Sequence, residues 1–122
     1  MPFIMAKVNV PVSSGQEEEI SKRLGKAVGA IPGKSEEYLM FGIEDCCRFR
    51  LRGTAQKAAY IEAAIFGNED HAGFAAFARS MTEIFHEVLG IPPANIYAKF
   101  EDIAAWSVSG MFIGGGRGRQ HG

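Results

Sequence analysis

The two halves of this chain repeat the same order of structure-breaking residues, and this repeat limits the possible folds more than any other feature. In the first half a helical segment leads through Gly29-Ala30-Ile31-Pro32 to Tyr38, and in the second another leads through Gly90-Ile91-Pro92 to Tyr97. In each half a strand-like segment precedes the helix and a second one opens at the tyrosine. A β-α-β unit of this kind holds its strands parallel through a right-handed crossover. We therefore expect an α+β fold: a duplicated β-α-β unit forming a four-stranded mixed sheet with two helices on one face.

Hydrophobic periodicity assigns the elements of each unit. Apolar residues alternate over residues 2–10 and dominate residues 58–66 apart from Glu62, which predicts two strands. Two more strands are expected over residues 38–43 and 95–100. A loop or short edge strand is expected over residues 46–56, and a short fifth strand over residues 111–113. Ser14-Gly15-Gln16-Glu17 is a capping-box pattern that opens a helix ending at Pro32-Gly33. A second helix is expected from about Asp70, with a buried stripe at spacings of three and four: Phe74, Phe77, Met81, Ile84, Phe85, Val88 and Leu89.

Two helices on one side of the sheet would leave its other face uncovered. We expect this face to be apolar and to consist of Ala59, Ile61, Ala63 and Ile65 or of the residues that alternate with them. Because a soluble domain does not normally expose a contiguous apolar patch of that size, copies of the chain are expected to associate and cover it.

Length and charge limit the classes of partner. The chain has 122 residues, so we expect a single domain over residues 1–113, followed by a flexible Gly/Arg-rich tail over residues 114–122. A formal net charge of -1 provides no general attraction to nucleic acid or to anionic membranes. The start of the chain lacks a secretory leader, and no later segment is long and apolar enough to span a membrane, so a cytoplasmic location is expected.

The cysteines and histidines do not indicate a metal or redox site. Cys46 and Cys47 are adjacent, and His71, His86 and His121 are widely spaced, so neither set has the spacing of metal ligands. We expect no metal and no cofactor.

Pro2 is the residue whose possible chemistry is most distinctive. Removal of Met1 would free a secondary amine held rigidly on a ring, and burial or a neighbouring cation would disfavour its ammonium form. Such an amine can act as a general base at neutral pH. Lys34, in the turn after Pro32-Gly33, is by itself typical of a solvated surface lysine.

Several segments together resemble one known family. They are Met1-Pro2-Phe3-Ile4, Asn9-Val10-Pro11, Gly33-Lys34 with Tyr38, Ala64-Ile65-Phe66-Gly67, and Leu89-Gly90-Ile91-Pro92-Pro93 with Tyr97. In this order they resemble the macrophage migration inhibitory factor branch of the tautomerase superfamily, over residues 2 to about 106. The resemblance implies the duplicated β-α-β fold, a symmetric homotrimer, and a cofactor-independent keto-enol tautomerase acting on a small 2-keto acid such as phenylpyruvate.

The same resemblance implies an active site between subunits. Pro2 would be the base, Lys34 and Ile65 would come from the same chain, and Tyr97 from its neighbour. Lys99 stands where animal members often have asparagine, and either offers a second cation or faces solvent. The closing segment of residues 106–112 keeps the family's tryptophan, glycine and phenylalanine, the last being Phe112, but has Val108 near the place of a second aromatic ring, which implies an altered pocket wall.

Two alternatives stay open at the level of sequence. The same trimer could be a non-catalytic binding or signalling scaffold whose N-terminus stays blocked. It could also be a decarboxylase or dehalogenase of the superfamily, with a cationic Pro2 and an arginine such as Arg50 or Arg52 binding the carboxylate. The Cys-x-x-Cys of vertebrate members is absent, with Lys57-Ala58-Ala59-Tyr60 in that region, so thiol-oxidoreductase activity is not expected.

Overall fold

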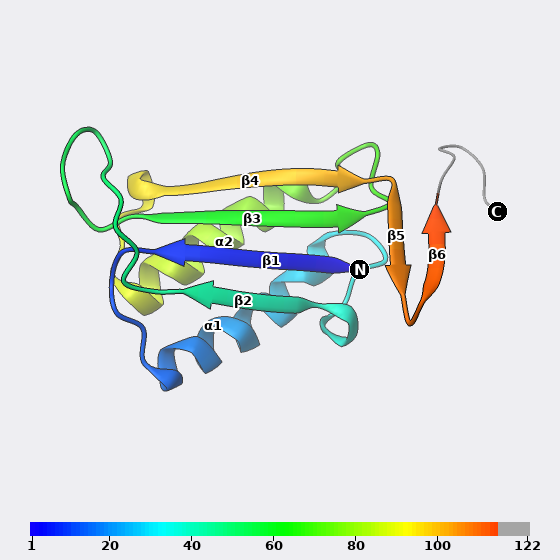
Figure 1. The fold of residues 1–122 in the computed structure, drawn as a ribbon, viewed down its shortest axis with the longest axis horizontal. Helices are drawn as coiled ribbons and strands as arrows, with labels where there is room; N and C mark the ends of the chain where they lie inside the picture. Colours follow the sequence, from blue (N-terminus) through cyan, green and yellow to red (C-terminus); the bar gives the residue numbers. More distant parts are fainter. Residues whose placement is uncertain (115–122) are drawn as a thin grey trace.

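The computed structural model of the chain describes residues 1–114 (Figure 1). The main elements, in chain order, are β1 (Pro2–Val8), α1 (Ser14–Ala27), β2 (Met40–Glu44), β3 (Ala59–Phe66), α2 (Phe74–Leu89), β4 (Ile96–Ile103), β5 (Ala105–Val108) and β6 (Met111–Gly114). Three short 3-10 turns lie at Val28–Ala30, Glu36–Tyr38 and Pro93–Asn95. Gly114 ends β6, and the rest of the expected tail lies outside the described residues.

The sheet confirms the duplicated β-α-β units. Its strand order is β2-β1-β3-β4, with β1 parallel to β2, β3 parallel to β4, and the central pair β1 and β3 antiparallel. Both helices cover the same face (Figure 1). Each helix is the crossover between the two parallel strands of its own unit, as a right-handed connection requires.

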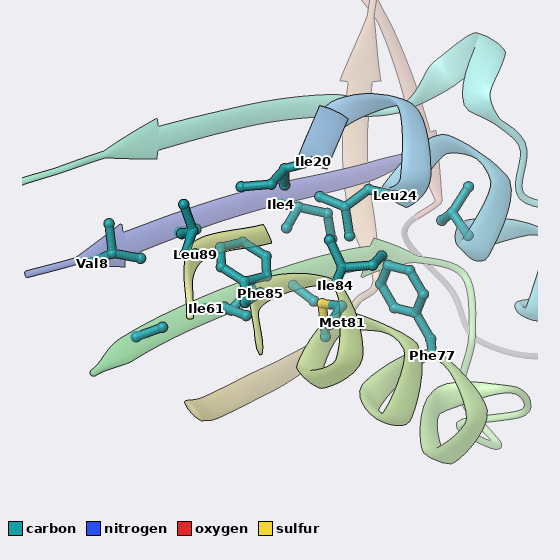
Figure 2. Close-up of a cluster of buried hydrophobic side chains, with 14 of the residues drawn as sticks. Ile4, Val8, Ile20, Leu24, Ile61, Phe77, Met81, Ile84, Phe85 and Leu89 are labelled. Carbon is teal, nitrogen blue, oxygen red and sulfur yellow. The ribbon is translucent and has the colours of Figure 1, made fainter. Parts of the chain in front are cut away.

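The core lies between the helices and the covered face of the sheet (Figure 2). Alternate residues of β1 and β3 point into it, and most are fully buried: Ile4, Ala6, Val8, Ala59, Ile61, Ala63 and Ile65. Helix α2 contributes the large side chains of Phe77, Met81 and Phe85. The predicted stripe at spacings of three and four is therefore the packed face of this helix.

The uncovered face of the sheet differs from the apolar surface expected. Because side chains alternate along a strand, the small and aliphatic residues of β3 lie under the helices, which leaves Tyr60 and Glu62 on the open face. Cross-strand ion pairs occupy this face: Lys7 Nζ lies 3.8 Å from Glu44 Oε1, and Lys99 Nζ lies 3.3 Å from Glu62 Oε2. The open face is thus a mixture of charged and apolar side chains, and the expectation of a bare apolar face was wrong.

Two helix starts also differ from the sequence prediction. The N-cap of α1 is Ser13, whose hydroxyl accepts from the backbone N–H of Gln16 at 3.1 Å while the Gln16 side chain accepts from the Ser13 N–H at 2.9 Å. The capping box is real, but it starts one residue earlier than expected. Helix α2 begins at Phe74 rather than near Asp70, because His71 and Gly73 have positive φ angles of 61° and 81° that interrupt the helical path.

The C-terminal part forms a hairpin at one end of the sheet. Strand β6 confirms the predicted short strand and pairs with β5, which the sequence did not indicate. Figure 1 shows this hairpin at the same end of the molecule as the N-terminus. No helix of the described residues is long and apolar enough to cross a membrane.

Candidate active site

Pro2 begins the first strand and lies at the end of the sheet. It is buried, and its register partner across the central antiparallel pair is Ile65. Met1 precedes it here, so the Pro2 nitrogen is an amide, and the Met1 carbonyl accepts from the Phe66 N–H at 3.4 Å. This pairing fixes the start of β1 between the end of β3 and the turn that carries Lys34.

Lys34 lies next to this chain end and is not simply solvated. It is placed by the turn after the first helix, where its N–H donates to the Ile31 carbonyl at 3.1 Å. Its ammonium Nζ donates to the Phe66 carbonyl at 2.7 Å. The hydrogen bond holds the cation at the end of β3, beside the first residues of β1.

This arrangement changes the acidity of the amine at the start of the chain. Burial, with the charge and hydrogen bonding of Lys34 adding to it, lowers the pKa of the Met1 α-amine to about 6. Both causes act in the same direction, because each penalises the ammonium form. The Met1 α-amine is therefore largely unprotonated at neutral pH, and an unprotonated amine is the state a general base needs.

The C-terminal hairpin forms a wall near the same end of the sheet. The Trp106 ring lies 6.3 Å from the Phe66 ring, centroid to centroid, and the Gly67 N–H donates to the Ile103 carbonyl at 3.1 Å. Phe112 is paired with Ser107 on the hairpin and is 71% exposed. The hairpin thus presents an uncovered aromatic ring on an element anchored next to Phe66.

Tyr97 and Lys99 do not join Pro2 within one chain. Pro2, Ile65 and Asp102 lie in one row across the sheet, and Tyr97 stands five residues before Asp102 on β4. At about 3.3 Å per residue this is roughly 16 Å along the strand, further than a tyrosine side chain reaches. Lys99 shares the open face with Tyr97 and is paired with Glu62, which itself accepts from the Tyr60 hydroxyl at 3.0 Å. Hydrogen bonding to Glu62 raises the pKa of the Lys99 ammonium.

Arg50 and Arg52 belong to the opposite end of the molecule. They lie in the segment that joins β2 to β3, which Figure 1 shows at the end of the sheet away from the N-terminus. Arg52 binds Asn95 Oδ1 at 2.9 Å and the Ala94 carbonyl at 3.1 Å. Within the described part of the chain no group of three or more His, Cys, Asp or Glu residues is arranged to hold a metal ion.

The structure therefore brings together three of the predicted site residues. Pro2, Lys34 and Ile65 meet at one end of the sheet, with Ile65 fully buried as a core residue beneath the helices. Phe66 was missed by the sequence analysis, although its carbonyl holds the Lys34 ammonium. The only signal was its place directly after Ile65, because a backbone acceptor leaves no mark on residue identity.

The two β-α-β units in one sheet, and the place of Lys34 beside the start of β1, agree with the resemblance of the sequence to the tautomerase superfamily. Residues 1–115 match the family model described as Macrophage migration inhibitory factor (MIF), and the chain belongs to this family. Among curated proteins none matches the sequence.

Solved structures agree with this assignment at the level of the fold. The chain is similar to Leishmania major MIF2, with 20% identity, a TM-score of 0.86, and 93% of this chain and 97% of that chain covered. It is also similar to a homologue of the factor from Prochlorococcus marinus, with 24% identity, a TM-score of 0.76, and 92% and 99% covered. A fused 4-OT described as an asymmetric trimer gives 16% identity, a TM-score of 0.78, and 89% and 94% covered. At these identities the similarity establishes the fold alone.

Proposed function

We propose that this chain is a keto-enol tautomerase that uses the Pro2 amine, freed by removal of Met1, as its general base. Its substrate is a small 2-keto acid of the phenylpyruvate type, and no cofactor takes part. The observation that carries the proposal is the position of the Lys34 ammonium, held 2.7 Å from the Phe66 carbonyl and next to the partly buried Met1 amine at the start of the chain.

The proposed chemistry is a pair of proton transfers. The unprotonated Pro2 nitrogen removes the proton from the carbon next to the ketone, and the electron pair of the broken C–H bond forms the enolate. The resulting Pro2 ammonium then gives a proton to the enolate oxygen, so the base returns to its starting state. Lys34 binds the carboxylate or the enolate oxygen through a charge-assisted hydrogen bond, which favours the more negative species.

We also propose that the chain works as a homotrimer with sites between subunits. Support comes from the position of Tyr97, which can contribute to a site containing Pro2 only if it belongs to another copy. The uncovered sheet face and the exposed side chains of Tyr97, Met111 and Phe112 offer contact surface for such copies. The trimeric 4-OT neighbour has the same fold. The free thiols of Cys46 and Cys47 agree with a cytoplasmic location.

The direct test compares three forms of the protein, each with its N-terminus verified by intact mass. We expect the Met1-free wild type to catalyse phenylpyruvate tautomerisation. A Met1-retaining form has an amide at Pro2, and Pro2→Ala has a more mobile primary amine, so both should lose most activity while keeping their fold and assembly. Full activity of Pro2→Ala on every accepted substrate would contradict the role of Pro2 as base.

The pH dependence separates a basic Pro2 from a cationic one. Activity of the processed wild type should rise with pH as the amine loses its proton, with a midpoint lowered by burial and by Lys34. Activity that falls as the amine loses its proton would instead favour a decarboxylase or dehalogenase. Absence of catalysis by the Met1-free protein would favour a binding scaffold.

A further inference from the structure

Phe66 ends β3 at the point where the proposed site and the C-terminal hairpin meet. Its backbone carbonyl accepts from the Lys34 ammonium at 2.7 Å, and its backbone N–H donates to the Met1 carbonyl at 3.4 Å. The N–H and C=O of one strand residue point to the same side, so both bonds face the start of β1. The backbone of Phe66 therefore holds the cation one register position beyond Pro2, whose partner is Ile65.

The side chain of Phe66 contacts the hairpin instead. Side chains alternate along β3, so the Phe66 ring lies on the opposite face from the buried Ile65 side chain. There its centroid is 6.3 Å from that of the Trp106 ring, and the two ring planes are inclined at 46°. Favourable aromatic pairs have separations of about 4.5–7 Å. This pair therefore connects the end of β3 with β5, the first strand of the hairpin.

The second strand of the hairpin approaches the same ring. A Cβ atom added at Gly114, the last residue of β6, would lie 3.1 Å from Phe66 Cε1 and would overlap the Ala104 carbonyl oxygen. The close approach is possible because residue 114 has no side chain. Both strands of the hairpin thus pack near one aromatic side chain.

We infer that Phe66 is a positioning residue that sets the two sides of the proposed site relative to each other. Its carbonyl holds Lys34, the cation for the substrate carboxylate, and its ring holds the hairpin that carries Trp106 and Phe112. An aromatic wall that is already in place costs less to order when a ligand binds. The inference rests on the proposed function and makes preference for an aryl acid over a short alkyl acid depend on Phe66.

The test compares two carboxylic acids that lack a ketone, 3-phenylpropanoate and propanoate, by calorimetric titration of the Met1-free chain in its own assembly state. Phe66→Leu removes the ring but keeps the carbonyl that binds Lys34. It should weaken binding of 3-phenylpropanoate by about twofold to tenfold, which corresponds to the contribution of one aromatic pair. Binding of propanoate should not change. Phe66→Tyr keeps a ring and should restore most of the affinity for 3-phenylpropanoate.

Trp106 reports the position of the hairpin directly, because it is the only tryptophan of the chain. Phe66→Leu should shift the Trp106 fluorescence emission to longer wavelength and increase its quenching by acrylamide, because the indole loses a packing partner. Phe74→Leu is the matched control. Phe74 also belongs to an aromatic pair, with its centroid 4.7 Å from that of Phe100, but it packs against the core under the helices. This variant should lower the melting temperature and leave the Trp106 emission and both affinities unchanged.

Several results would overturn the inference. They are equal weakening of both acids by Phe66→Leu, the same selective loss in Phe74→Leu, a Trp106 emission in Phe66→Leu that stays that of the wild type, and a wild type that does not bind 3-phenylpropanoate. The proposed function fails on a different result. In that case the Met1-free chain binds 3-phenylpropanoate, with the expected effect of Phe66→Leu, but does not tautomerise phenylpyruvate.

Discussion

At the scale of single residues, Lys34 connects the backbone of β3 with the chemistry at the start of β1. Its hydrogen bond to the Phe66 carbonyl keeps a long, flexible side chain in one place, and its charge acts on the amine beside it. In the proposed reaction Lys34 has two separable roles. It would bind the anionic substrate, and it would lower the proton affinity of the Pro2 amine.

Replacing Lys34 by alanine tests the first effect. A charge-assisted hydrogen bond to substrate contributes about 1.5–3 kcal/mol, so KM for the keto acid should rise by roughly tenfold to a hundredfold. The lost bond to Phe66 should lower the free energy of unfolding by only about 1 kcal/mol. Steady-state kinetics and chemical denaturation measure the two quantities. Unchanged kinetics would show that Lys34 does not bind the substrate and is an ordinary turn lysine.

The second effect can be measured on the protein that retains Met1. Its α-amine should titrate with a midpoint of about 6, against 8.0 for an unperturbed amine, and Lys34→Ala should move the midpoint upward. Isotope-edited NMR of the Met1 amine would follow this titration. Between these two pH values the unfolded chain holds a proton that the folded chain has released, so this group makes stability rise with pH across that window. A midpoint that stays at 8.0 in the folded protein would show that the amine is solvated.

At the scale of elements, the junction between the two units depends on one glycine. Gly73 caps the start of α2 with a φ angle of 81° and lies against the end of the first helical segment, where a Cβ atom would come within 2.2 Å of the Ala30 carbonyl oxygen. Backbone rather than a flexible side chain blocks this position. The two helices can therefore approach only if residue 73 has no side chain.

Gly73→Ala should consequently lower the free energy of unfolding by more than the conformational effect alone. Gly53→Ala is a matched control, because Gly53 has the same φ angle of 81° but no atom within 4 Å of the added Cβ. Gly53→Ala should lower the free energy of unfolding by about 1–2 kcal/mol, because alanine is strained in the left-handed conformation. Gly73→Ala should lower it by clearly more. Equilibrium denaturation of both variants measures the difference. Equal losses of unfolding free energy in the two variants would show that the backbone near residue 73 moves to accommodate the added Cβ atom.

The same elements show which parts of the fold could be predicted from the sequence alone. The parallel pairs and the buried stripe of α2 were predictable, because periodicity and the repeated Ile-Pro turns are local signals. The start of α2 was not, because it depends on the positive φ angles of His71 and Gly73, which hydrophobic periodicity does not reveal. Tyr38 lies in a 3-10 turn, and the strand opens at Met40. At the site, the place of Lys34 followed from resemblance, whereas its bond to Phe66 required the fold.

At the scale of the whole molecule, the proposed homotrimer would bring Tyr97 of one chain toward Pro2 of another and could use the open face of the sheet. Because that face carries ion pairs, such contacts would not be simply hydrophobic. Cross-strand pairs such as Lys99 with Glu62 are already satisfied within one chain, so they can approach a neighbouring copy without presenting an unpaired charge.

Subunit mixing tests whether Pro2 and Tyr97 of different chains meet. Pro2→Ala and Tyr97→Ala chains should each have low activity, but mixed trimers contain interfaces with an intact Pro2 from one chain and an intact Tyr97 from the other. Activity should therefore return when the two are refolded together. Sedimentation of each variant should show three chains of 13.2 kDa, about 40 kDa, as the control. A stable monomer at micromolar concentration, or no recovery on mixing, would contradict a shared site.

The antiparallel pairing of β1 with β3 gives the domain an approximate internal twofold axis. Rotation about this axis superposes Ala59, the first residue of β3, on Pro2. It also superposes Tyr97 on Met40, because the register partner of Tyr97 is Tyr60 and that of Met40 is Phe3. The two positions have the same backbone setting, but Ala59 is joined to the segment before it. The fold thus contains the backbone scaffold of this position twice but the proposed basic nitrogen only once, because a chain has a single amino end. A protein cut before residue 59 would have a second amine in the equivalent place.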